Sequence, residues 1–307
     1  MSSKAVFGLV VIGLGTLPSG SRESRVSAVL VDALQQEVAA GQASLERQLV
    51  LIEDHSTWAN RRVVSSEHFQ VETTQSYAFG QAVAQDLESM LVHFQAFTGS
   101  QLRGGAPMVV RVFPDVPSYN ALGEEFAEHS SFYGSFYASG QGDDAIATNY
   151  SDNWTLLRMW TTHSALHHYL ARAFPGSTVP TWIDEGLASY FSLFWDYGYG
   201  VDEFERMRDS GRLLDLDDLL DGELADYQDR SHERLIQVGM LFTYLINVHP
   251  ESRTVKDAEG KITSQPFVDY VLLRIRGKAN PAHSIRKLLF GDNTELQKAF
   301  HGYAQWR

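Results

Sequence analysis

The sequence predicts an α+β fold in which a small N-terminal mixed sheet with its helices precedes a mainly helical part. Apolar runs of strand length at 68–73 and 108–113 flank a helical pattern at 77–97. The second half of the chain instead repeats apolar residues at helical spacing. With 307 residues, of which 44% are hydrophobic, the chain is long enough to bury a substantial core.

Residues 1–21 are predicted to form a signal peptide. Lys4 precedes the apolar run Ala5–Leu17, which suits the hydrophobic region of such a peptide and is too short for a comfortable membrane span. We therefore expect export to the periplasm or the extracellular space; a buried strand in a cytoplasmic protein is the alternative. Gly13-Leu14-Gly15 suggests a dinucleotide-binding loop, but Pro18 stands at the position of its third glycine, which argues against that motif.

Residues 22–62 are predicted to form a helical spacer. Apolar residues recur there at helical spacing, at Val26, Val29, Leu30, Leu34 and Val38. We expect this helix to dock onto its own domain; a free spacer and a partner-binding helix are the alternatives.

Residues 63–150 are predicted to form an α/β subdomain that holds the two strands and the helix between them. Near its end, the glycine- and aromatic-rich stretch 131–144 is expected to form a loop over the site described below. Tyr137 in this loop is a candidate donor of a hydrogen bond to a developing oxyanion. Packing of the aromatic ring against a cleft is the alternative.

Residues 151–307 are predicted to form a helical subdomain. Apolar residues and histidines at three- and four-residue steps indicate its first helix, for which the capping and stop signals are Ser151 or Asp152, and Pro175-Gly176. A second helix is expected from Pro180. Further helices are predicted at 201–210, 213–220, 232–248, 267–275 and 282–290, and the polar stretch 253–265 is expected to be an exposed loop.

Two histidines on the first of these helices are the most informative feature of the chain. His163 and His167 are four residues apart, so their rings project from one face and can hold a single cation. In the zinc-peptidase motif H-E-x-x-H, a glutamate after the first histidine takes a proton from metal-bound water; here this position is Ser164. The short turn to the second helix favours an antiparallel pair, which brings Glu185 towards the histidines. Histidines that are hydrogen-bonded in the core or at the surface are the alternative.

The stretch Trp182–Phe191 follows the pattern W-x-x-E-G-x-A-x-Y-F without a gap. Together with the two histidines, it resembles the gluzincins, and in particular the bacterial peptidase-MA-like family. The resemblance extends more loosely from about residue 66 to the C-terminus. It implies a gluzincin-like zinc-site subdomain in which His163, His167 and Glu185 bind one zinc ion. It also implies that an edge strand of the sheet forms a wall of the substrate cleft.

Ser164 is the main departure from this family. A serine hydroxyl does not accept a proton at physiological pH as a carboxylate does, and general acid–base catalysis contributes about 100- to 10,000-fold. Ser189 likewise stands where related sites often have an acid that orients a histidine. We therefore expect a degenerate metallopeptidase, in which zinc is retained and peptide hydrolysis is weak or absent.

Two other functions stay open. One is an active metallopeptidase with a surrogate base, for which Asp184, His168 and Tyr137 are the candidates. Asp184 is expected to point about 100° away from Glu185 around its helix, and His168 is turned away from His167 in the same manner. The other is a non-catalytic module that binds a peptide or protein segment on a peptidase scaffold.

Composition argues against several further classes. A net charge of −13 without clustered Lys and Arg argues against a nucleic-acid partner, and no segment has the length and apolarity of a membrane span. The absence of cysteine excludes disulfides, thiolate metal sites and iron–sulfur clusters. The aspartates within 215–221 lack the glycine and terminal glutamate of a calcium loop. The expected partner is therefore a peptide or protein segment.

Overall fold

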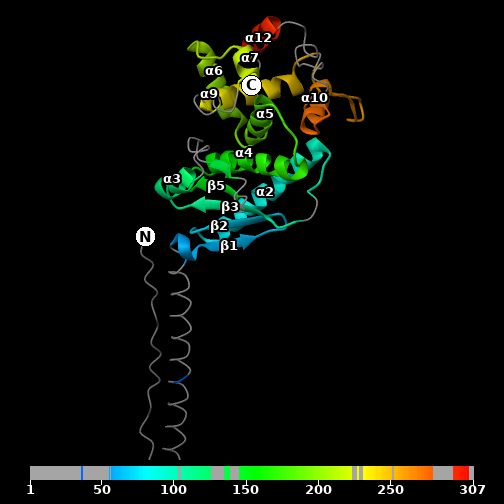
Figure 1. Ribbon diagram of the computed structural model, residues 1–307. Helices are drawn as coiled ribbons and strands as arrows, with labels where there is room; N and C mark the ends of the chain where they lie inside the picture. The colour runs from blue at the N-terminus through cyan, green and yellow to red at the C-terminus, as the bar shows by residue number, and fades with distance from the viewer. Residues whose placement is uncertain are drawn as a thin grey trace, which may run out of the picture. The chain divides into compact units, whose positions relative to one another are not determined.

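The computed structural model shows a mixed sheet followed along the chain by a group of helices (Figure 1). It describes residues 36, 55, 57–102, 105–125, 135–138, 145–222, 227, 231–250, 252–278 and 293–303. The chain divides into two units, 1–54 and 55–307, and Gln36, which is described in the first unit, lies in a helix. The predicted signal peptide and most of the predicted spacer lie outside the described residues.

The sheet consists of five strands: β1 (Arg62–Ser65), β2 (Phe69–Thr73), β3 (Met108–Phe113), β4 (Ser135–Ala138) and β5 (Ala145–Asn149). Their order is β1-β2-β3-β5-β4. β2 and β5 pair with β3 in parallel, whereas the edge strands β1 and β4 are antiparallel to their neighbours, so the sheet is mixed. Met108, Val110 and Val112 of the central strand are each 0% exposed, which is the two-residue period of a strand that packs on a core.

Three helices accompany the sheet in the chain: α2 (Tyr77–Thr98), α3 (Val116–Glu125) and α4 (Trp154–Ala173). α2 begins at an N-cap, because the Ser76 hydroxyl accepts a hydrogen bond of 3.1 Å from the backbone N–H of Phe79. α2 packs on β1 and β2, α4 packs on β4 and β5, and the two helices contact each other. They therefore cover one face of the sheet side by side (Figure 1).

The rest of the described chain is mainly helical and comprises α5 (Thr181–Ser192), α6 (Tyr197–Asp209), α7 (Leu216–Leu220), α9 (Ser231–Asn247), α10 (Pro266–Ile275), α12 (Asn293–His301) and a hairpin of β6 (Val255–Lys256) and β7 (Ile262–Ser264). α5 and α9 approach closely through two glycines. A Cβ atom on Gly186 would lie 2.3 Å from the Phe242 ring, and one on Gly239 would lie 2.9 Å from the Cβ of Ser189. α5 also contacts α4, so this packing holds α5 between α4 and α9.

The structure confirms the predicted α+β fold class. Both predicted strands and the helix between them are present, and α4, α5, α6, α9 and α10 lie close to their predicted positions. Two strands that complete the sheet, β1 and β5, were not predicted, nor were α3, α12 and the β6–β7 hairpin. Within the described ranges, no helix is long and apolar enough to cross a membrane.

Two local predictions about the sheet and the site helix are wrong. Ser135–Ala138 belongs to a strand rather than a loop, because it pairs with β5 along its whole length. The N-cap of α4 is Asn153, not Ser151 or Asp152: its side chain accepts a hydrogen bond of 3.2 Å from the backbone N–H of Leu156. The other residues of the predicted loop, 131–134 and 139–144, lie outside the described residues.

A third correction concerns the predicted helix 213–220, which begins only at Leu216. Leu214 is held outside the helix because both of its backbone groups bond to the Gln237 side chain, at 2.9 Å from the N–H to Oε1 and 2.7 Å from Nε2 to the carbonyl oxygen. The predicted helix 282–290 lies outside the described residues.

Candidate metal site

The site begins with α4, which is fixed to α2 by a partly buried arginine. Arg158 donates two hydrogen bonds to Asp86, at 2.5 Å and 3.0 Å. Its guanidinium group also lies 5.4 Å from the ring centre of Trp154 and 4.5 Å from that of Trp195. Trp195 in turn donates a hydrogen bond of 2.7 Å to the Thr162 hydroxyl, next to the first histidine. These contacts set the rotation of α4 about its axis.

Glu185 comes from α5, which is anchored on both sides of this residue. Trp182 is 4% exposed and stacks on Tyr270 with ring centres 6.4 Å apart. Gly186 contacts Phe242 of α9, and Leu187 is 0% exposed. The Glu185 carboxylate is therefore carried into the protein interior and is directed towards α4.

The two histidines and the glutamate meet at one point between α4 and α5. His163 Nε2 lies 3.1 Å from Glu185 Oε2 and 3.1 Å from His167 Nε2. The third distance, from His167 Nε2 to Glu185 Oε2, is 3.7 Å. Each residue offers one ligand atom, and the group could hold a metal ion. The structure thus brings together the three residues that the sequence suggested as ligands.

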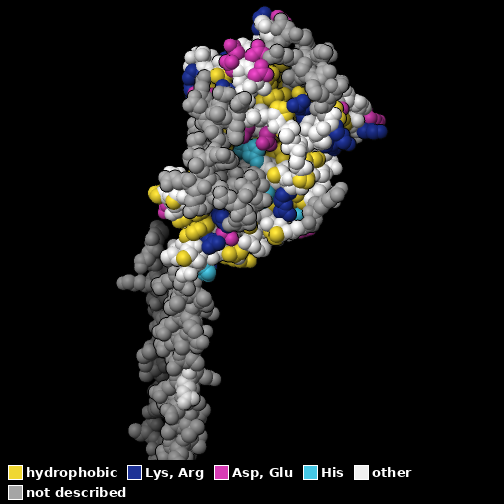
Figure 2. All heavy atoms as spheres, in the orientation of Figure 1, with side chains coloured by type: hydrophobic (Ala, Val, Ile, Leu, Met, Phe, Trp, Pro, Cys, Tyr) yellow, Lys and Arg dark blue, Asp and Glu magenta, His cyan; other side chains and the backbone are white. Residues whose placement is uncertain are grey.

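The site is close to the surface although its carboxylate is buried. The side chains of both histidines are 16% exposed, whereas that of Glu185 is 5% exposed. Figure 2 shows histidine and acidic side chains next to each other at the surface over the region of α4 and α5. A small molecule can therefore reach the histidine side of the group.

Asp184 contacts the group from its outer side, which the sequence interpretation missed. Its Oδ1 lies 3.2 Å from His167 Nδ1. We expected Asp184 to point away from the group, and this was wrong. A rotation of about 100° from Glu185 brings Asp184 to the opposite edge of the His167 ring, where it contacts Nδ1. A carboxylate at Nδ1 orients the ring and leaves Nε2 to face the ligand position.

Glu185 and His167 shift each other's pKa. Burial by itself raises the pKa of Glu185, but attraction to His167 and hydrogen bonds with both histidines outweigh it and hold this pKa well below its usual range. Burial lowers the pKa of His167, but the charges of Asp184 and Glu185 outweigh this and raise it well above the usual value. Both shifts favour the charged forms, an ionised Glu185 beside a protonated His167.

Ser164 and two of the candidate bases are either buried or already in contact with the group. Ser164 is 1% exposed and His168 is 2% exposed, so both lie in the core. Asp184 is engaged at the outer nitrogen of His167. Tyr137 lies on edge strand β4, which contacts α4. The side chain of Tyr137 lies outside the described part of the structure.

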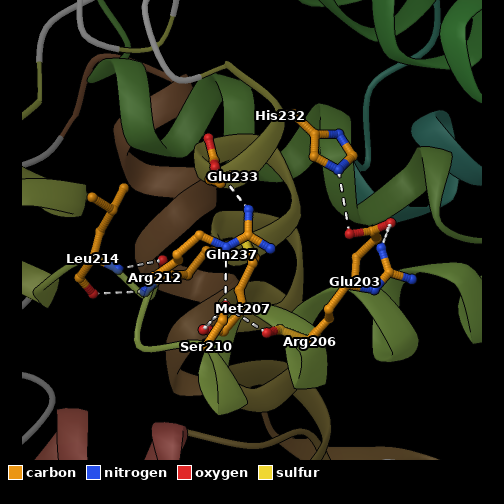
Figure 3. A network of polar contacts seen from close by, with 9 residues as sticks. All are labelled: Glu203, Arg206, Met207, Ser210, Arg212, Leu214, His232, Glu233 and Gln237. Atoms are coloured by element: carbon orange, nitrogen blue, oxygen red, sulfur yellow. Dashed lines mark hydrogen bonds and ion pairs between the residues drawn. The ribbon is translucent and has the colours of Figure 1, made fainter.

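A cavity of about 390 Å³ lies next to the group and shares His163 with it. His232, at the start of α9, also lines this cavity. His232 Nε2 is 3.6 Å from Glu203 Oε2 of α6, and Arg206 donates to the other oxygen of the same carboxylate (Figure 3). No spacing in the sequence links His232 to Glu203, because each lies on a different helix and the cavity forms only when these helices pack.

The contact between α6 and α9 is reinforced beyond this pair. Arg212, just after α6, lies 3.2 Å from Glu233 of α9, and Gln237 of α9 bonds to the backbone of Leu214 (Figure 3). These bonds hold α9, which contributes His232 to the cavity, against the segment that follows α6.

Comparisons with known proteins do not assign a family: no family model matches this chain, and no curated protein matches it. The resemblance to gluzincins therefore stays a prediction from the residues of the site.

Proposed function

We propose that this chain is a gluzincin-like protein that binds one zinc ion through His163, His167 and Glu185, and in which peptide hydrolysis is weak or absent. The observation that carries the proposal is the convergence of three ligand atoms on one point. Two imidazoles and a carboxylate are a ligand set of catalytic zinc sites, which leave a fourth position for water or substrate.

The spacing of the ligand atoms fits such an ion. Zinc bonds to histidine and carboxylate are about 2.0–2.1 Å long, so the ligand atoms of a tetrahedral site lie about 3.3 Å apart. The distances among the three atoms here are 3.1, 3.1 and 3.7 Å. Asp184 at His167 Nδ1 supplies the outer carboxylate that metal-bound histidines usually have. Bound zinc would supply an activated water molecule and an electrophile.

The weak or absent hydrolysis follows from the position after His163. Ser164 offers no carboxylate to accept a proton, and its side chain is buried. Of the surrogate bases considered, Asp184 is held at the outer nitrogen of His167 and His168 lies in the core. These contacts favour a degenerate site over an active peptidase with a surrogate base.

A non-catalytic peptide-binding module is the second candidate, and the cavity beside His163 favours it. A cavity of about 390 Å³ falls within the range of about 300–1,000 Å³ that small-molecule sites usually have. Such a site can hold a side chain of a bound peptide without any chemistry at the metal.

The test has two steps. Elemental mass spectrometry of the purified chain should find about one zinc per chain, and His163→Ala should lose it. In the zinc-loaded protein, Ser164→Glu should then raise hydrolysis of a mixed peptide library by about 100-fold or more, whereas Ser164→Gln, of the same size without the base, should not. Absence of zinc after reconstitution contradicts the metal site. Hydrolysis by the unmodified protein at the rate of Ser164→Glu contradicts the degenerate site and favours a surrogate base.

A further inference from the structure

The cavity beside His163 has walls that suit an apolar group. Its apolar lining comes from three helices: Leu156, Met159 and Trp160 of α4, Leu193 just after α5, and Leu235 and Ile236 of α9. Because these helices are held by the Arg158, Gly186 and Gly239 contacts, the walls of the cavity are fixed by packing. An apolar group that enters it loses its contact with water at little cost in protein ordering.

The volume of the cavity sets the size of that group. An apolar cavity of about 150 Å³ accepts benzene. The volume of about 390 Å³ therefore leaves room for a group larger than a single six-membered ring. A bicyclic ring system meets this requirement and is rigid, so it loses little conformational entropy on binding.

One polar atom in the wall needs a partner. The Ser189 hydroxyl oxygen is buried and has no hydrogen-bond partner among the described residues, although the residue lines the cavity. A buried hydroxyl left unpaired costs about 1–3 kcal/mol. A serine hydroxyl oxygen carries two lone pairs, so it can accept a hydrogen bond from a ligand. A ligand with one N–H or O–H donor would satisfy it.

Three other polar side chains of the wall already have partners. The Ser192 hydroxyl donates a hydrogen bond of 2.9 Å to the backbone oxygen of Ser189. His232 is paired with Glu203, and His163 belongs to the metal group. Ser189 differs from these three, because its hydroxyl oxygen is buried and can accept a hydrogen bond from a ligand donor.

We propose that this cavity binds a bicyclic apolar group with one hydrogen-bond donor, the indole of a tryptophan residue in a bound peptide, with Ser189 Oγ as the acceptor. The indole N–H is a donor without acceptor capacity, which complements a free hydroxyl oxygen. The inference rests on the proposed function in one respect: a peptide whose tryptophan fills the cavity would also lie next to the metal site, because His163 belongs to both.

The first experiment titrates the metal-free chain with indole and with indene, a ring system of the same shape that lacks the N–H. Ligand-observed NMR measures both dissociation constants. We expect indole to bind about 2- to 10-fold more tightly, which is the contribution of one neutral hydrogen bond. In Ser189→Ala, which keeps the cavity open, the two ligands should bind equally. Neither probe has a metal-binding group, so failure of the zinc proposal leaves this result unchanged.

A second variant tests the place of binding. Leu156→Trp adds a bulky ring to the α4 wall and should weaken indole binding about 10-fold or more. Leu272→Trp is the matched control, because Leu272 is also a half-buried helical leucine but lies outside the cavity lining; it should leave binding unchanged. If Leu156→Trp does not fold, the indole and indene comparison in Ser189→Ala still decides the matter.

A third experiment identifies the source of the ring. The zinc-loaded chain is titrated with the peptide Gly-Gly-Trp-Gly-Gly and with the same peptide carrying alanine for tryptophan. Binding of the first peptide that is lost in the second and in Leu156→Trp supports the proposal. Absence of saturable indole binding, an unchanged preference for indole in Ser189→Ala, or binding of free indole without binding of the tryptophan peptide overturns it.

Discussion

Two buried carboxylates, Glu72 in the sheet and Glu185 in the helical part, are neutralised in different ways. Glu72 Oε2 lies 2.8 Å from Arg61 Nε and 3.2 Å from Arg111 Nε, and its side chain is 8% exposed. Glu185, 5% exposed, faces histidines instead. Arginine keeps its charge at every physiological pH, whereas histidine can also exist as a neutral imidazole that binds a metal ion.

This difference separates a structural charge cluster from a candidate functional one. The arginines of Glu72 cannot make room for another cation, because their charge is permanent and their bonds join β2 to β3 and to the segment before β1. At Glu185 the partners are imidazoles, which bind a cation in their neutral form, so a carboxylate and two ring nitrogens surround one point. The comparison predicts that mutations in the first cluster change stability and that mutations in the second change metal binding.

The largest effect is expected from His163→Ala. Loss of an outer partner of a ligand costs about 10- to 100-fold in metal affinity, and loss of a ligand itself costs more, so we expect zinc affinity to fall about 1,000-fold or more. Competition with a chromophoric chelator measures it. The control is His93→Ala, an exposed histidine on α2, which should bind zinc normally. Equal affinity in both variants would contradict the ligand assignment.

Glu72→Gln tests the other side of the comparison. Removal of one partner from a buried ion cluster leaves uncompensated charge, so the free energy of unfolding should fall by about 3 kcal/mol, with or without zinc. Urea denaturation measures it. Glu67→Gln is the control, since its side chain is 84% exposed, and it should change stability by less than about 0.5 kcal/mol. If Glu72→Gln changed zinc affinity and left stability unchanged, the prediction that the Glu72 cluster is structural would be contradicted.

Asp184→Asn should have a smaller effect on the metal site. The amide keeps the size of the side chain but removes the charge at His167 Nδ1, so zinc affinity should fall about 10- to 100-fold while one zinc per chain still binds. The matched control is Asp209→Asn, whose side chain is 70% exposed and lies at the end of α6. If Asp184→Asn binds zinc as tightly as the native chain, Asp184 does not position His167.

The ligand residues could be predicted from the sequence because their relation is local. A helix places His163 and His167 on one face, and a short turn to α5 brings Glu185 back to that face. The core strand β3 was predictable for the same reason, since its apolar run lies within six consecutive residues. Asp184 was misjudged because its role depends on the far edge of an imidazole ring, which helix periodicity alone does not describe.

The rest depends on contacts between segments that are distant in the chain. The sequence of β4 shows no clear alternation of apolar and polar residues, and the strand forms because it pairs with β5. The cavity is enclosed by α4, α5 and α9, and the pairing of His232 with Glu203 arises where α6 meets α9. No single window of the sequence contains these neighbours, so no local pattern could have indicated them.

The smallest and most specific effect concerns the pH dependence of the metal-free chain. The lowered pKa of Glu185 gives stability that is present above its unfolded value of about 4.5 and is lost as pH falls towards the folded value. The raised pKa of His167 gives stability that is present below its unfolded value of about 6.5 and is lost as pH rises through the folded value. Both contributions are therefore complete between about pH 4.5 and 6.5.

Urea denaturation across this range tests the point. In the metal-free chain, the contribution of this site should decline above pH 6.5, and His167→Ala should remove that decline. In the zinc-loaded chain the decline should vanish, because the ion takes the place of the proton and binds the neutral imidazole more strongly as pH rises. Glu72→Gln should keep the alkaline decline, since its arginines do not titrate there. A decline that persists in His167→Ala would mean that the pH dependence arises outside the histidine–glutamate group.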